Sequence, residues 1–88
     1  MPILSMFYGI IVRMYSEPRG KHNAPHIHVQ YQDKVAVYSL EGVVLEGEMP
    51  TKQHRMILAW IAIHEDELYA NWELLCSGQE YYKITPLE

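Results

Sequence analysis

The hydrophobic pattern of this chain changes its period at Pro50, and that change constrains the fold more than any other feature. Before residue 50, apolar and β-branched residues form short runs separated by Gly, Pro and polar residues, as in strands. A helix with one apolar stripe needs an apolar surface to cover, which such strands supply. The pattern therefore predicts an α+β fold. After Pro50, apolar-stripe residues recur at spacings of three and four, as on one side of an amphipathic helix: Ile57, Ile61, His64, Leu68, Trp72 and Leu75.

Four consecutive strands are predicted, over residues 5–15, 26–31, 35–40 and 43–45, with a last strand over 81–85. We expect a single domain spanning residues 1–88, built as an antiparallel meander in the order β-β-β-β-α-β. A helix from Pro50 to Ser77 would reach about 40 Å at roughly 1.5 Å per residue, which is longer than a small sheet needs. We therefore expect either one long, bent helix or two abutting helices, with the break between His64 and Asp66. The helix covers one sheet face and leaves the other to water or to a partner.

Charge and composition indicate where the protein works. The net charge of −4 argues against a generic phosphate-binding protein, although residues 13–28 form a local basic patch whose only acid is Glu17. The sequence shows no apolar run long enough to span a bilayer and no basic-then-apolar leader pattern, and the lone Cys76 can form no internal disulfide. We expect a cytoplasmic protein with no membrane association, and Cys76 packed in the core.

The segment Asn23-Ala24-Pro25-His26-Ile27-His28-Val29 contains the first candidate site. Because strand side chains alternate, His26 and His28 leave one face while Ile27 and Val29 leave the other. Two imidazoles on one face can ligate a divalent transition metal if a third ligand joins them. The alternative is that both rings are hydrogen-bonded to neighbouring carbonyl or carboxylate groups. The candidates for a third ligand are His22, His54, His64, Asp33 or a glutamate.

Arg13, His26 and His28 form a second hypothesis, a catalytic set without a metal. Arginine offers a fixed fork of donors to an anion, and histidine titrates near neutral pH, so the three side chains would support phosphodiester cleavage. The structural alternative for Arg13 is a side chain paired with a carboxylate. For His64, on the helix stripe, we expect a hydrogen-bonded residue at the core boundary.

Association with other chains is the third hypothesis. Seven tyrosines and two tryptophans in 88 residues exceed what so small a core buries, and exposed aromatic residues favour interfaces. Trp60 and Trp72 lie at helical spacing and are expected to pack in the core. An exposed edge strand would also allow homodimerisation by sheet pairing.

Several segments together resemble one known family: residues 3–14 (ILSMFYGIIVRM), 23–29 (NAPHIHV), 45–47 (LEG), the helix with Trp60, and 67–72 (ELYANW). They are similar to the bacterial domain of unknown function 4160, and the resemblance covers nearly the whole chain. Its most specific element is a segment of the type N-P-P-H-F-H-V, from which Ala24 and Ile27 depart conservatively. The polar positions that match the family are Arg13, His26 and His28.

The resemblance implies association rather than a particular activity. Members look like components of two-gene bacterial modules that resemble toxin–antitoxin pairs. We therefore expect one component of a toxin–antitoxin-like or regulatory pair, which binds a partner protein from a neighbouring gene, and also nucleic acid, through Arg13, His26 and His28. The alternative is a phosphodiester hydrolase of the ribonuclease type, with or without a metal.

Overall fold

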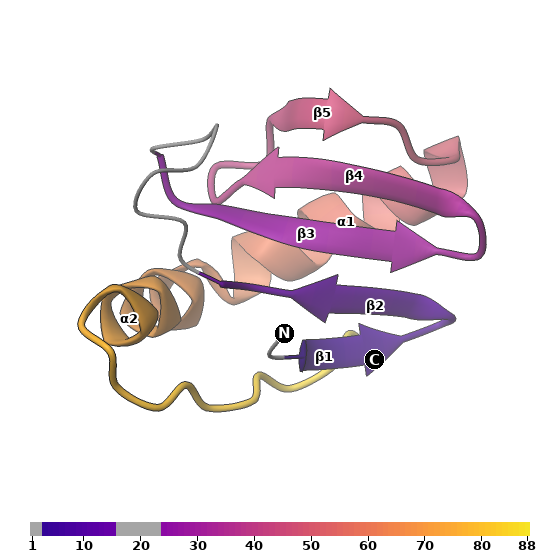
Figure 1. The fold of residues 1–88 in the computed structure, drawn as a ribbon. Helices are drawn as coiled ribbons and strands as arrows, with labels where there is room; N and C mark the ends of the chain where they lie inside the picture. Colours follow the sequence, from indigo (N-terminus) through magenta and orange to yellow (C-terminus); the bar gives the residue numbers. More distant parts are fainter. Residues whose placement is uncertain (1–2, 16–23) are drawn as a thin grey trace.

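The computed structural model describes residues 3–15 and 24–88. Within these residues, five strands form one antiparallel sheet in the order β1-β2-β3-β4-β5, and two helices follow (Figure 1). The predicted α+β fold and antiparallel meander are confirmed. The elements are β1 (Ile3–Phe7), β2 (Ile10–Arg13), β3 (His26–Tyr31), β4 (Lys34–Ser39), β5 (Val44–Gly47), α1 (Thr51–Ile63) and α2 (Glu65–Cys76).

The predicted strand over residues 5–15 is wrong in one respect, because the chain turns back at Tyr8 and Gly9. These residues have φ angles of 48° and 80°, and positive φ at both central residues is the pattern of a type I′ hairpin turn. Phe7 and Ile10 close the hairpin as a cross-strand pair. The run is therefore two strands, β1 and β2, rather than one.

The long helical segment forms two abutting helices, which is the second of the two predicted forms. α1 ends at Ile63 and α2 begins at Glu65, and His64 lies between them with φ −111° and ψ 23°. Three acidic residues occupy the first turn of α2, where carboxylates are favourable because of the helix dipole. His64 Nδ1 lies 2.7 Å from Glu67 Oε1, which confirms the expected hydrogen-bonded boundary histidine.

The predicted strand over residues 81–85 is absent, and the segment crosses the molecule as an extended strap (Figure 1). Among the described residues, one backbone bond joins it to the sheet, from the Ile84 N–H to the Leu4 carbonyl oxygen at 2.9 Å. Two side chains also hold it: Trp60 Nε1 donates to Thr85 O at 3.0 Å, and Asn71 Oδ1 accepts from the Tyr82 N–H at 2.8 Å. One backbone bond forms no ladder, so the segment is not a sixth strand.

The hydrophobic core lies between the sheet and α1, which covers one sheet face (Figure 1). Trp60 is fully buried beside Phe7, with ring centroids 5.5 Å apart, and Trp72 packs against the core from α2. Cys76 is exposed rather than packed in the core, because it lies in the last turn of α2. Neither helix in the described part of the chain has the length and apolar character of a membrane span.

Candidate functional site

The candidate site lies on the outer face of the sheet, the face turned away from α1. Strand register places four residues in one row across four strands: Arg13 pairs with His28, His28 with Val37, and Val37 with Glu46. Their neighbours along the strands, such as Val12, Ile27 and Tyr38, point into the core instead. The row thus carries a cation at its β2 end and a carboxylate at its β5 end.

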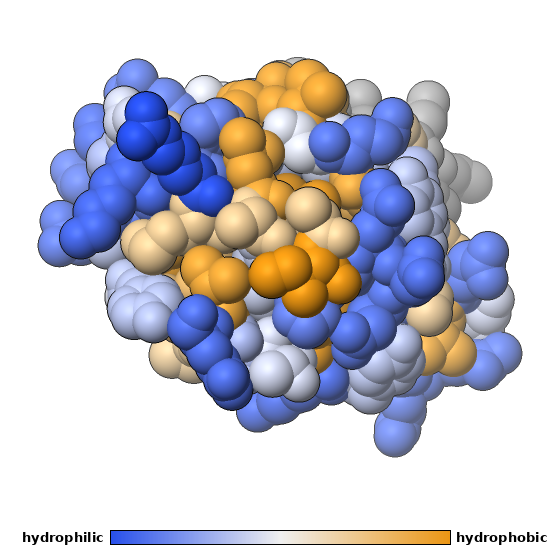
Figure 2. All heavy atoms as spheres, turned by 180° about the vertical axis from the view of Figure 1, so that it is seen from behind, coloured by the Kyte–Doolittle hydropathy of each residue, from blue (hydrophilic) through white to orange (hydrophobic). Residues whose placement is uncertain are grey.

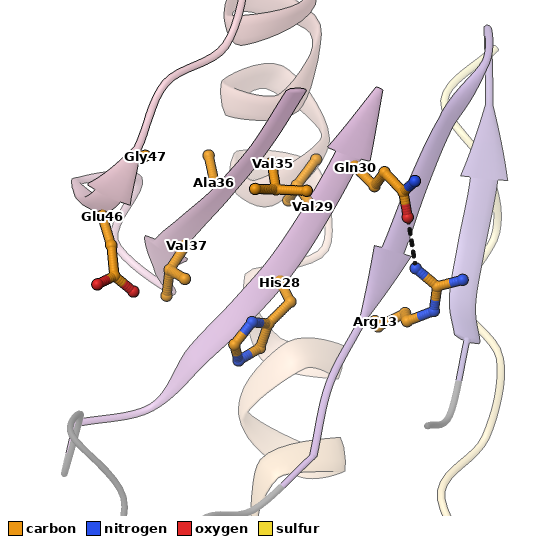
Figure 3. A pocket seen from close by; sticks show the side chains of 9 residues that line it. All are labelled: Arg13, His28, Val29, Gln30, Val35, Ala36, Val37, Glu46 and Gly47. Atoms are coloured by element: carbon orange, nitrogen blue, oxygen red, sulfur yellow. Dashed lines mark hydrogen bonds between the residues drawn. The ribbon is translucent and has the colours of Figure 1, made fainter. Parts of the chain in front are cut away.

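This row forms the centre of a groove of about 330 Å³ (Figure 3). Val35 and Val37 contribute apolar surface, and the polar side chains come from three different strands, β2, β3 and β5. A pocket of this size with a few polar groups around apolar surface is typical of a binding site. The lining residues are Arg13, His28, Val29, Gln30, Val35, Ala36, Val37, Glu46 and Gly47.

Arg13 is half-buried, and its partner is an amide rather than an acid. Nη1 donates to Gln30 Oε1 at 3.0 Å, and among the described residues no carboxylate lies within ion-pair distance of the guanidinium (Figure 3). The alternative prediction, that Arg13 pairs with a carboxylate, is therefore wrong as far as the carboxylates of residues 3–15 and 24–88 are concerned. Because a guanidinium has five N–H donors, one amide oxygen leaves most of its hydrogen-bonding capacity for a ligand.

His28 is held in the groove by a ring stack. Tyr15 lies almost parallel to it, with ring centroids 4.4 Å apart and an interplanar angle of 17°, and the Tyr15 hydroxyl is 3.4 Å from His28 Nδ1. Strand alternation places Tyr15 on the same face as Arg13. Because Arg13 pairs with His28 across the strands, Tyr15 lies close enough to stack on His28.

His26 occupies a different environment from His28, although both leave the same face of β3. Its side chain is fully buried, and its Nδ1–H donates to the Ala24 carbonyl oxygen at 2.9 Å. The ring lies 5.1 Å from the ring of Trp72 on α2 and 5.1 Å from that of His28. The structure therefore brings Arg13 and His28 together in the groove. His26, two residues before His28 on β3, does not line the groove.

The metal hypothesis gains no third ligand from the described residues. In residues 3–15 and 24–88, no group of three His, Cys, Asp or Glu side chains is arranged to hold an ion. Two of the named candidates are engaged elsewhere, because His54 Nδ1 lies 2.7 Å from the Tyr38 hydroxyl and His64 bonds to Glu67. His22, a third candidate, lies outside the described residues. The assignment of His26 and His28 as ligands remains a prediction.

Of the nine residues that line the groove, sequence reasoning named only Arg13 and His28 as site residues; Gln30, Glu46 and Gly47 are among those it missed. Gln30 was detectable, since it alternates with His28 on β3. Glu46 was not, because its place in the row depends on an irregularity of the β4–β5 register: Val37 pairs with Glu46 and Tyr38 with Val44, which leaves Leu45 of β5 without a pair. Gly47 has φ +79°, and a Cβ there would collide with the Val35 carbonyl oxygen, so only glycine allows β5 to end so close to β4.

Comparison with known proteins identifies the family. Neither the curated proteins nor the solved structures include a match to the chain. The family model described as a domain of unknown function (DUF4160) matches residues 9–73, well over half of the chain and including every lining residue of the groove. The chain therefore belongs to the DUF4160 family.

Proposed function

We propose that this protein binds a partner protein as one component of a two-gene, toxin–antitoxin-like or regulatory pair, and that the outer-face groove receives an acidic side chain of that partner. The observation that carries the proposal is Arg13: a half-buried guanidinium in a groove, with an amide as its hydrogen-bond partner and no carboxylate beside it among the described residues. A buried or half-buried charge is stable when it is paired and hydrogen-bonded.

The chemistry of the groove favours a carboxylate attached to an apolar segment. The planar fork of Arg13 matches a carboxylate in two parallel hydrogen bonds, each contributing about 1.5–3 kcal/mol. Val35 is 62% exposed and offers apolar surface next to that charge. The formal charge of −4 works against binding a nucleic acid through phosphates in general, so a protein partner is the better match.

Co-purification with the product of a neighbouring gene tests this proposal. We expect Arg13→Ala to weaken the complex at least tenfold and His28→Ala to weaken it less, both without loss of the folded circular dichroism spectrum. Arg55→Ala is the matched control, because Arg55 is an exposed arginine on α1, in the layer opposite the groove. Unchanged binding by Arg13→Ala, or an equal loss with Arg55→Ala, contradicts the proposal. His26→Ala is a poorer probe, since His26 is fully buried and its loss affects packing.

A second candidate function rests on the pairing of Arg13 and His28. The two residues are direct cross-strand neighbours and line the same groove, so an anion held by the guanidinium would lie beside an imidazole able to transfer a proton. A phosphodiester hydrolase of this type should cleave an oligoribonucleotide, and His28→Ala should abolish cleavage while binding persists. Elemental analysis of the untagged protein and of His28→Ala, with no chelator, separates metal-dependent from metal-independent chemistry. Cleavage that survives His28→Ala would exclude this assignment.

A further inference from the structure

The two edges of the sheet differ in how they end. The C-terminal strap ends beside β1 (Figure 1). The Ile84 N–H donates to the Leu4 carbonyl oxygen, and Lys83, Ile84 and Pro86 line a pocket together with residues 3–6. At the opposite edge, β5 is bonded to β4 on its inner side, and no described residue pairs with its outer side. All four residues of β5 are exposed. An unpaired strand edge is a template for another extended chain.

The side chains around β5 are apolar and acidic together. Val43, Val44 and Leu45 are 58%, 39% and 39% exposed, three consecutive apolar residues at the surface. Hydrophobic side chains gather along the top of the molecule in Figure 2, the side on which β5 lies in Figure 1. Glu46 and Glu48 come next in the chain, on either side of Gly47. Among the described residues, Lys34 makes an exposed contact of 3.5 Å with Glu48.

We propose that the outer edge of β5 receives an extended segment of a partner protein in which lysine or arginine alternates with apolar residues, added as a sixth strand. This inference rests on the proposed function, because it assigns a second contact to the same kind of partner. Backbone hydrogen bonds to β5 provide the affinity, and the alternating side chains provide the specificity. The basic residues face the carboxylates of Glu46 and Glu48, and the apolar ones pack near Val44 and Leu45.

Charge argues for this occupant over a second copy of the chain. If β5 paired with β5 of another copy in an antiparallel register centred on Gly47, Glu46 of each strand would lie across from Glu48 of the other. Like charges opposite each other across a strand pair are destabilising, whereas opposite charges stabilise it. A basic segment from a different protein therefore fits the edge better than self-association does.

A designed peptide tests the edge without knowledge of the partner. The probe is a fluorescent ten-residue peptide of alternating lysine and valine, and its controls are the alternating glutamate–valine peptide and the lysine–valine peptide with N-methylated backbone amides. We expect the lysine–valine peptide to bind and to slow amide exchange at residues 44–47. The N-methylated peptide should not bind, because it has lost its backbone donors, and the glutamate–valine peptide should bind at least tenfold more weakly.

Variants of the protein test the charge argument. Glu46→Gln with Glu48→Gln should weaken probe binding at least fivefold. The matched control is Glu73→Gln with Glu80→Gln, which makes the same change in net charge at exposed positions away from β5 and should leave binding unchanged. Equal binding of the N-methylated probe, protection of another edge, or a β5-protected dimer of the free protein would overturn the inference.

The test also separates this inference from the proposed function. Arg13→Ala should not alter probe binding, since Arg13 lies on β2, at the far end of the cross-strand row from β5. In the co-purified complex, residues 44–47 should be protected from amide exchange. A complex that depends on Arg13 but leaves these amides unprotected would overturn the edge assignment and leave the proposed function intact. Probe binding at β5 without any co-purifying partner would support the edge assignment and contradict the proposed function.

Discussion

Gly47 is the residue at which the groove and the β5 edge depend most directly on one backbone conformation. We expect Gly47→Ala to destabilise the protein more than Gly78→Ala. Both glycines have positive φ, +79° and +74°, so each substitution carries a left-handed strain of about 1–2 kcal/mol. At Gly78 nothing lies near the added methyl group, whereas at Gly47 it meets the Val35 carbonyl and lies 2.9 Å from Ala36 Cα. Urea unfolding of the two variants measures the difference, and equal losses would contradict this account.

Tyr38 links the sheet to α1 and should give the stability an alkaline limit. Burial raises the pKa of its hydroxyl above the ordinary value of 10.0, so the folded protein holds this proton more tightly than the unfolded chain does. The resulting stabilisation is complete below about pH 10 and is lost as the pH rises through the raised pKa. Tyr38→Phe removes the 2.7 Å contact with His54, at a cost of about 1 kcal/mol near neutral pH.

Urea midpoints at about pH 8 and about pH 11 test this behaviour, on either side of the ordinary tyrosine pKa. The free energy of unfolding should fall less steeply with alkali in Tyr38→Phe than in the natural protein. Tyr82→Phe is the control, because Tyr82 is 43% exposed. An identical alkaline slope in Tyr38→Phe and in the natural protein would rule out the role assigned to Tyr38.

At single residues, the alternation of side chains along a strand predicted which face of the sheet each side chain occupies, but not whether that side chain is buried. It correctly placed His26 and His28 on one face of β3 and Ile27 on the other. It did not distinguish a buried His26 from a groove-lining His28, because that difference comes from Trp72, which α2 brings against His26 from 46 residues further along the chain. Contacts of that kind leave no periodic signal in the sequence.

At the scale of elements, the same limit appears at both ends of the chain. Tyr8 at φ 48° makes the first turn, and tyrosine is a residue that rarely adopts positive φ, so the run looked like one uninterrupted strand. The segment at 81–85 is rich in β-prone residues, yet it forms a strap, because strand propensity depends on a ladder partner. The helix stripe was predictable from local spacing, and the break at His64 from the length of the helical segment.

Asn71 connects two elements, and Asn71→Ala should loosen the strap. The side chain is fully buried, donates from Nδ2 to the Glu67 carbonyl oxygen at 3.2 Å, and accepts from the Tyr82 N–H at 2.8 Å. Leaving these groups unpaired should cost about 1–3 kcal/mol and speed amide exchange at Tyr82 and Ile84. Glu73→Ala, an exposed change on the same helix, is the control. Unchanged exchange at Tyr82 would show that the strap is held by other contacts.

For the whole molecule, the strap has two tasks: it completes the core and covers the β1 edge. Removing residues 79–88 would expose the core around Leu4 and leave Trp60 Nε1 without its acceptor at Thr85. We expect the truncated protein to unfold at a lower temperature and to self-associate, since a second sheet edge becomes available. Calorimetry and size-exclusion chromatography with light scattering measure both effects. A monomeric product with an unchanged midpoint would refute this role.

The aromatic contacts beside the groove also give the molecule an optical property. Ring centroids follow one another at 5.1 Å from Trp72 to His26, 5.1 Å from His26 to His28 and 4.4 Å from His28 to Tyr15, so the series runs from α2 to the groove. The emission of an indole depends on the rings packed against it. With Trp60 replaced by phenylalanine, Trp72 is the sole indole, and its fluorescence becomes a label-free report of how these rings pack beside the groove.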